Sequence, residues 1–451
     1  MTEPLAMPNN VPSPAGIASG DAAPAKLPSL RRNYTLMLLG NVIYTGCQWA
    51  MLMVLAKLTH PEQVGQFGLG LAVVGPVILF AGLQLRSIQA TDAHERYRFG
   101  DYLLLRLLCI ICALVAITFI VLLSKYDTET RLIILVVGFA KSVEAMSDVY
   151  YGFFQQFERM GYIAVSMIIK GISSIAALWF CVYQTRSVLY GCIGLTLTWL
   201  IVFLCYDVPC ARFLARTLRE GDYRQLLALR YDFRLLWQIT WLALPLGGVM
   251  MLISLSSNLP RYYLVNYQGH GGYAIGIFSA LYSLLVAGST IAGAFGQAAT
   301  PRLAHLYADK DYSGFYLLLK KLLFIGVLIG AVGILVAVTC GHFLLLHLFK
   351  PVYACYLHEF ILVMVGAAIL YLAAFLGYGL TAARILKSQL PLLCVVTLVT
   401  LLGAWWLIPR GGIAGAAGTV IVSSSALLLG SLFLLLRSVP YLSHAAKGDS
   451  Q

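Results

Sequence analysis

The feature that most constrains this chain is its series of apolar runs, each about 20 residues long and separated by short polar connections. A helix of that length crosses the hydrocarbon core of a bilayer, which is roughly 30 Å thick. The sequence contains twelve such runs, near residues 34–57, 64–85, 102–123, 132–154, 161–182, 189–206, 237–262, 272–298, 317–339, 356–380, 388–408 and 412–436. It therefore predicts an all-α polytopic membrane protein with about 12 transmembrane helices.

The composition supports that class. The chain is 60% hydrophobic and 11% charged, whereas soluble domains average about 45–50% apolar and about 25% charged residues. The first 30 residues are the exception, because they are rich in Pro, Ala and Ser and contain no apolar run. We interpret them as a disordered tail and not as a signal peptide, which would need an apolar core.

The basic residues predict the orientation in the membrane. If the N-terminus lies inside, 22 Lys and Arg residues fall on the cytoplasmic side and 7 on the outer side, which agrees with the positive-inside rule. Both termini are therefore predicted to be cytoplasmic. The net charge of +12 is then a topology signal, with added attraction to anionic membrane lipids. It does not indicate a nucleic-acid partner.

The runs fall into two groups of six, which predicts two six-helix bundles. The predicted divisions are a cytoplasmic tail over 1–30, an N-terminal bundle over 31–206, a connector over 207–236, a C-terminal bundle over 237–437 and a second cytoplasmic tail over 438–451. The connector carries six Arg residues among apolar ones, which is typical of an amphipathic helix on the inner leaflet. The segments Val64–Gly68 and Ile275–Ser279 have similar sequences. The similarity suggests duplication, although chance is an alternative explanation for so short a match.

Charged residues interrupt the fourth run. Lys141, Glu144 and Asp148 lie on one helical face, within about 60° of one another at 100° per residue. Each costs about 2.5–3.5 kcal/mol on membrane-insertion scales. The face they share is therefore predicted to contact protein or a water-filled cavity instead of lipid.

Polar stripes on other runs extend this prediction to a hydrated cavity. The predicted lining residues are Asn41, Thr45, Gln48, Ser166, Ser173, Ser254, Ser257 and Asn258. The predicted cavity cations, which would bind an anionic cargo, are Lys141, Lys170, Arg261 and Arg86. Glu144 and Asp148 are predicted to couple transport to protons or another ion.

A structural interpretation of the same charges stays open. Lys141 can neutralise Glu144 or Asp148, and Lys170 can pair with the remaining acid. Arginines near the ends of runs, such as Arg261 and Arg86, can extend to the headgroups instead.

The sequence predicts neither a metal site nor a cofactor. The Cys109–Cys112 pair lies inside an apolar run without His or acidic neighbours. Asp309 and Asp311 form a DxD pattern in a short loop that lacks a surrounding nucleotide-binding fold.

Three stretches of the N-terminal half point to a family. They are HPEQVGQFGLGLAVVGPVILF, LQLRSIQATDAHERYRFGDYLLLR and AKSVEAMSDVYYGFFQQFERMGYIAVSMIIKG. They resemble bacterial polysaccharide biosynthesis proteins of the oligosaccharide flippase type, in the multidrug/oligosaccharidyl-lipid/polysaccharide exporter superfamily. The C-terminal half is similar mainly in hydropathy, with Thr300–Leu303 resembling the family's usual end to that helix.

The resemblance implies a V-shaped pair of bundles around a central cavity, alternating between inward-open and outward-open states. It implies a bacterial inner-membrane protein that moves an undecaprenyl-pyrophosphate-linked oligosaccharide to the outer leaflet, for O-antigen lipopolysaccharide, capsule or exopolysaccharide. Fixed cations would bind the pyrophosphate. A polysaccharide polymerase or a chain-length regulator is the kind of protein partner that it implies.

Two other functions compete with this interpretation. A cation-coupled drug exporter of the same superfamily needs an acidic cation site, whereas Lys141 and Lys170 favour an anionic cargo. A polysaccharide polymerase or ligase usually carries a large outer loop with catalytic groups, and the predicted outer connections are short. A transporter is therefore favoured over an enzyme.

Overall fold

The computed structural model of the chain describes residues 30–92, 97–218, 231–267, 271–385 and 388–439. These residues form helices joined by short connections, and no β-strand occurs among them. The predicted all-α class is confirmed. The N-terminal tail up to residue 29, the C-terminal tail from residue 440 and residues 219–230 of the predicted connector lie outside the described residues.

The first half of the chain forms one bundle. Its helices are α1 (Leu30–Leu58), α2 (Pro61–Gly82), α3 (Leu85–Thr91), α4 (Phe99–Leu123), α5 (Thr128–Gln156), α6 (Met160–Thr185) and α7 (Val188–Val202). α7 continues through a π-helical turn, η2 (Phe203–Asp207), into α8 (Val208–Leu218).

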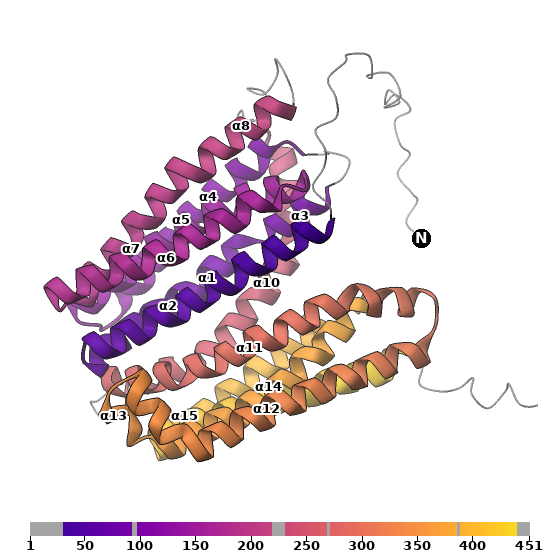
Figure 1. Ribbon diagram of the computed structural model, residues 1–451. Helices are drawn as coiled ribbons and strands as arrows, with labels where there is room; N and C mark the ends of the chain where they lie inside the picture. Colours follow the sequence, from indigo (N-terminus) through magenta and orange to yellow (C-terminus); the bar gives the residue numbers. More distant parts are fainter. Residues whose placement is uncertain (1–29, 93–96, 219–230, 268–270, 386–387, 440–451) are drawn as a thin grey trace, which may run out of the picture.

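The second half forms another bundle. Its helices are α10 (Phe233–Leu264), α11 (Gly271–Ala308), α12 (Tyr312–Leu348), α13 (Pro351–Ala354), α14 (Leu357–Ala382) and α15 (Gln389–Ser438). Figure 1 shows the two bundles meeting where α2 and α11 begin and diverging toward the end where α8 lies. We call these the closed end and the splayed end.

The helices have the lengths that a membrane requires. Within the described residues, ten helical segments are long and apolar enough to span it. α5 has 29 residues but carries three charged residues in its middle. α15 has 50 residues and contains the non-helical Gly412, so it is long enough for two crossings. Together these helices are consistent with the twelve predicted spans.

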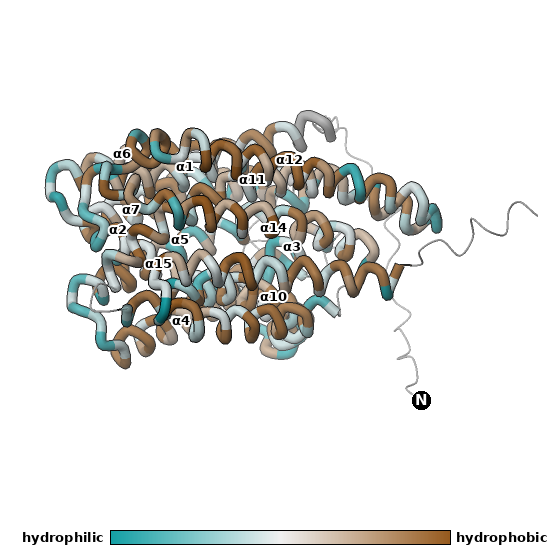
Figure 2. Tube along the Cα trace, turned by 90° about the horizontal axis from the view of Figure 1, so that it is seen from below, coloured by the Kyte–Doolittle hydropathy of each residue, from teal (hydrophilic) through white to brown (hydrophobic). Residues whose placement is uncertain are grey.

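Apolar side chains cover the outside of the bundles. Val115, Phe324 and Trp405 are among many exposed large apolar residues. Figure 2 shows hydrophobic residues along the helices and hydrophilic residues gathered at the connections between them. An apolar surface of this extent is suited to lipid and not to water, so the chain is a multi-pass membrane protein.

Small residues hold the bundles together at the closed end. A Cβ added to Gly276 of α11 would lie 1.8 Å from the carbonyl oxygen of Pro61, and one added to Gly65 of α2 would lie 2.0 Å from that of Gly272. Only glycine permits so close an approach of two helix backbones. The segments Val64–Gly68 and Ile275–Ser279, whose similarity suggested duplication, thus pack against each other.

A lysine adds a polar contact at the closed end. The Nζ of Lys350, between α12 and α13, donates to the carbonyl oxygen of Thr59 at the end of α1. Burial lowers the pKa of Lys350, and the positive charge of Arg186 lowers it further. The contact ties the connection after α12 to the opposite bundle.

α10 contacts both bundles. Leu236, Ile239 and Ala243 in its first half are buried in the core of the N-terminal bundle. Further along, a Cβ at Gly247 would lie 2.8 Å from the carbonyl oxygen of Phe80 on α2, while Ser256 Oγ lies 2.8 Å from Thr397 Oγ1 on α15 of the C-terminal bundle. The division at residue 237 stays a prediction, because this helix belongs by contact to both sides.

Candidate functional site

A cavity of about 620 Å³ lies between the bundles, bordered by α1 and α2 on one side and by α10 and α11 on the other. Six of its lining residues are predicted ones: Thr45, Gln48, Ser254, Ser257, Asn258 and Arg261. The lining residues on α11 were not predicted from the sequence, and they include Ser279, Tyr282, Ser283 and Thr290. Hydroxyls scattered in an apolar run are also common in ordinary helix packing, so nothing in the sequence distinguishes these as cavity residues.

Arg261 is the cation of this cavity. Its Nη1 donates to Asn258 Oδ1 at 2.5 Å and its Nε to Ser279 Oγ at 3.1 Å. Its guanidinium lies 4.9 Å from the centre of the Tyr282 ring. The four ion pairs found among the described residues do not include Arg261. Its positive charge is therefore solvated by neutral groups only.

The other predicted residues on α1, α5 and α6 lie outside this lining. Asn41 is half-buried on α1, and Ser173 donates to the carbonyl oxygen of Ile169 on its own helix at 2.5 Å. Lys141 of α5 lines a small crevice that shares Gln48 with the cavity.

Lys141 is already neutralised. Its Nζ lies 2.7 Å from Glu144 Oε2 and 5.1 Å from the centre of the Trp199 ring. The hydroxyl of Tyr44 on α1 donates to the other oxygen of Glu144. The lysine and the acid that the sequence placed on one face therefore form a local pair.

Arg86 and Asp148 form a second pair on the same face of α5. Arg86 Nη1 lies 3.1 Å from Asp148 Oδ1, and Arg86 Nε donates to Gln155 Oε1 at 3.2 Å. The guanidinium also lies 5.4 Å from the centre of the Tyr151 ring. Arg106 of α4 approaches the other oxygen of Asp148, at 3.9 Å.

A break in the helix positions Arg86. Leu83 and Gln84, which follow α2, both have φ of 50°. This left-handed conformation costs a non-glycine residue about 1–2 kcal/mol. The break ends α2 and starts α3 at Leu85, which directs Arg86 toward α5. Such strain is often found at functional sites.

Lys170 lies inside the N-terminal bundle. Its side chain is 2% exposed, and its Nζ lies 2.7 Å from Asp207 Oδ2, a carboxylate that is 0% exposed. The Nζ also donates to Ser147 at 2.5 Å and to the Tyr151 hydroxyl at 3.0 Å. Ser166 donates to Asp207 at 2.6 Å. The structure thus places Lys170 and Ser166 in a buried network and not on the cavity wall.

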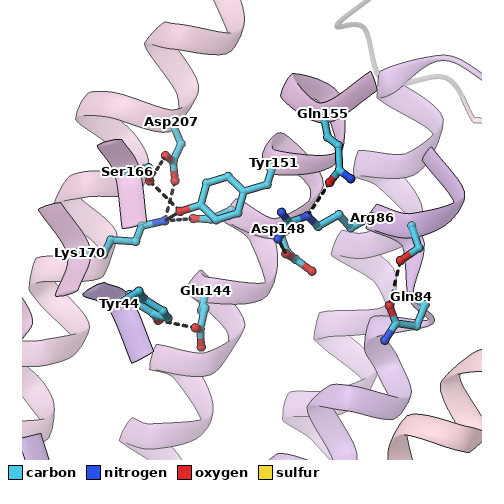
Figure 3. Close-up of polar contacts among 12 residues, drawn as sticks. Tyr44, Gln84, Arg86, Glu144, Asp148, Tyr151, Gln155, Ser166, Lys170 and Asp207 are labelled. Carbon is cyan, nitrogen blue, oxygen red and sulfur yellow. Dashed lines mark hydrogen bonds and ion pairs between the residues drawn. The ribbon is translucent and has the colours of Figure 1, made fainter. Parts of the chain in front are cut away.

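Asp207 is the member of this network that the sequence analysis missed. It was assigned to the connector because it follows the sixth apolar run directly. The π-helical turn η2 adds a residue to the helix there and brings the carboxylate inward. Figure 3 shows Tyr151 between this network and the Arg86–Asp148 pair.

The structure offers no metal centre among the residues it describes. No group of three or more His, Cys, Asp or Glu residues is placed to hold an ion there.

A model of the family described as polysaccharide biosynthesis protein matches residues 30–307. The chain is 28% identical over 402 residues to the capsular polysaccharide biosynthesis protein CapF of Staphylococcus aureus, covering 88% of this chain and 97% of that protein.

The fold also resembles solved transporters. An inward-facing conformation of a multidrug resistance MATE family transporter of the MOP superfamily matches with a TM-score of 0.72 and 14% identity, covering 89% of this chain and 98% of that one. An outward-facing conformation of such a transporter matches with a TM-score of 0.57 and 15% identity, covering 90% and 94%. At these identities the likeness shows the fold alone.

Proposed function

Because this chain belongs to the polysaccharide biosynthesis protein family, we propose that it moves a lipid-linked oligosaccharide across the membrane. The family that the sequence resembles is confirmed, and the fold is that of MOP superfamily transporters. The proposed cargo is an oligosaccharide joined through pyrophosphate to undecaprenol. The proposed direction is from the cytoplasmic leaflet to the outer leaflet of the bacterial inner membrane.

Arg261 carries the proposal. A guanidinium in a membrane-embedded cavity, paired with no carboxylate of the described residues, favours an anion there. Arg presents several donors in a planar fork, which matches the oxygens of a phosphate. The neutral lining of the cavity, with Gln48, Asn258 and the α11 hydroxyls, supplies partners for sugar hydroxyls.

The relation between the bundles supports alternating access. The TM-score is higher with the inward-facing transporter, 0.72, than with the outward-facing one, 0.57. We propose that the closed end faces outward and that the splayed end admits cargo from the cytoplasm. Transport would then open the glycine contact between Gly65 and Gly276 while the splayed end closes.

The proposed roles of the predicted cations now differ. Arg261 keeps the proposed role of a phosphate contact, and so does Arg86, because Arg86 and Arg106 share the single carboxylate of Asp148 and their cluster stays positively charged. Lys141 and Lys170 are paired with Glu144 and Asp207, so we assign neither of them a direct contact with cargo.

A drug exporter remains the competing function because of the fold. A cationic drug requires an unpaired carboxylate in the cavity. Glu144 and Asp148, the predicted ion-coupling residues, each face a cation. This pairing favours an anionic cargo.

Transport of the cargo tests the proposal. In proteoliposomes that contain a fluorescent undecaprenyl-diphosphate oligosaccharide, we expect Arg261→Ala to slow flipping by about 10- to 100-fold. The loss corresponds to charge-assisted hydrogen bonds of roughly 1.5–3 kcal/mol. Arg261→Lys, which keeps the charge, should retain part of the rate.

Arg410→Ala is the control, because Arg410 is exposed and its Nη1 donates to a carbonyl of its own helix. A wild-type rate for Arg261→Ala would contradict the proposal.

A further inference from the structure

We propose that Arg86, Arg106 and Asp148 form an exchangeable phosphate site. In the unloaded protein, the Asp148 carboxylate occupies the position that a phosphate group of the cargo takes over. The inference rests on the proposed function and adds a second phosphate-binding site, separate from Arg261. The recognised chemistry is a phosphate or diphosphate ester.

The geometry is that of an anion held between two guanidinium groups. Oδ1 of Asp148 faces Arg86 at 3.1 Å and Oδ2 faces Arg106 at 3.9 Å. The three side chains carry two positive charges and one negative charge, so the cluster keeps a net positive charge with the carboxylate in place. A phosphate brings more acceptor oxygens and more negative charge than a carboxylate does.

Arg106 is poorly satisfied by Asp148 alone. Its side chain is 3% exposed, and its Nε has no hydrogen-bond partner among the described residues. The 3.9 Å separation from Asp148 exceeds the length of a hydrogen bond. A buried, unsatisfied donor on a charged group is costly, and an incoming phosphate oxygen would remove that deficit.

The site is accessible and preorganised. The Asp148 side chain is 42% exposed, so it can leave without unfolding its surroundings. Arg86 keeps its hydrogen bond to Gln155 and its position over the Tyr151 ring when the carboxylate moves away. The guanidinium that binds the phosphate is therefore already oriented.

The site is also joined to the contact between the bundles. Arg86 follows the strained residues Leu83 and Gln84 at the break after α2. A Cβ at Gly247 of α10 would lie 3.0 Å from Leu83 Cδ2, so Leu83 packs closely on the helix that both bundles share. The backbone that carries Arg86 is therefore packed, through Leu83, against a helix that contacts both bundles.

Binding of inorganic pyrophosphate tests the exchange without any transport step. The full chain is placed in nanodiscs of neutral phospholipid and titrated by calorimetry. Asp148→Asn removes the competing charge at constant size, and we expect its Kd for pyrophosphate to fall about tenfold, equivalent to roughly 1.4 kcal/mol. Arg106→Gln should raise the Kd by a similar factor.

Asp309→Asn is the matched control, because it removes the same charge from an exposed loop and should leave the Kd within about twofold. Asp148→Ala and Arg106→Lys repeat the test if either first variant is unstable. An unchanged Kd in the Asp148 variants, or an equal fall in Asp309→Asn, would overturn the inference.

Competition distinguishes the source of the phosphate. Undecaprenyl diphosphate in the nanodisc should displace pyrophosphate from the wild-type protein, and phosphatidylglycerol at the same content should not. Displacement by phosphatidylglycerol alone would make this a headgroup site and overturn its assignment to cargo. If flipping fails while the exchange is observed, the proposed function fails alone; if flipping succeeds without exchange, this inference fails alone.

Discussion

Lys170→Met is expected to destabilise the protein by about 3–5 kcal/mol, the usual cost of removing one partner of a buried ion pair. The substitution leaves the Asp207 carboxylate, 0% exposed, without its cation. Ser166 alone then donates to it among the present partners of this network. Unfolding of the purified protein in detergent, followed by circular dichroism, measures the loss.

Two further variants separate burial from charge. The double variant Lys170→Met with Asp207→Asn removes both charges. It should recover much of the stability, because no unpaired buried charge is left. Lys141→Met is the control, since its pair with Glu144 is 26% and 30% exposed, and a partly exposed pair costs less to break than a fully buried one. Equal losses for Lys170→Met and Lys141→Met would contradict the buried-pair assignment. If Lys170→Met abolished transport and left the stability unchanged, Lys170 would have to be assigned to the cargo path instead of the buried pair.

Gly276→Val should strongly reduce transport, because it prevents the closed end from closing. The added Cβ would overlap the carbonyl oxygen of Pro61 at 1.8 Å, and the backbones of α2 and α11 must separate. Overpacking of this kind costs about 1–3 kcal/mol, which shifts the balance between two states by up to about 100-fold. We therefore expect the outward-open state to be favoured.

Spin labels at Glu62 and Val352, in a cysteine-free background, measure this separation by pulsed electron resonance. The distance between them should lengthen in Gly276→Val. Gly377→Val is the matched control, because a Cβ at Gly377 meets nothing within 4 Å. An unchanged distance, or an equal loss of transport in Gly377→Val, would show that the closed end does not depend on this glycine contact.

The transmembrane helices were largely predictable because the bilayer fixes their length. Even α5 could be located, although Lys141, Glu144 and Asp148 lower its hydropathy, because apolar residues flank the charges on both sides. The division inside α15 is also visible in the sequence, where the predicted runs separate near the non-helical Gly412.

The site was predictable only as far as helical faces. On α1 and α10, polar residues at helical spacing predicted the face that lines the cavity, and Gln48 and Asn258 do lie there. Spacing gives the face of a helix but not the helix opposite it. Lys170 therefore could not be told apart from a cavity residue, since its position depends on how Asp207 is turned inward. Arg106 was counted only as a cytoplasmic charge, because its approach to Asp148 depends on the packing of α4 against α5.

The sharing of α10 has a mechanical consequence. Pro245 directly follows Leu244, which packs on the core of the N-terminal bundle, and Pro260 precedes the cavity cation Arg261. Each proline removes a backbone hydrogen bond, so a helix bends there at low cost. α10 thus has two positions at which it can bend, and along its length it contacts α2 of one bundle and α15 of the other. The proposed reversal of access then requires α10 to bend in addition to the rotation of the two bundles. Cargo bound beside Arg261 would lie next to the bend at Pro260.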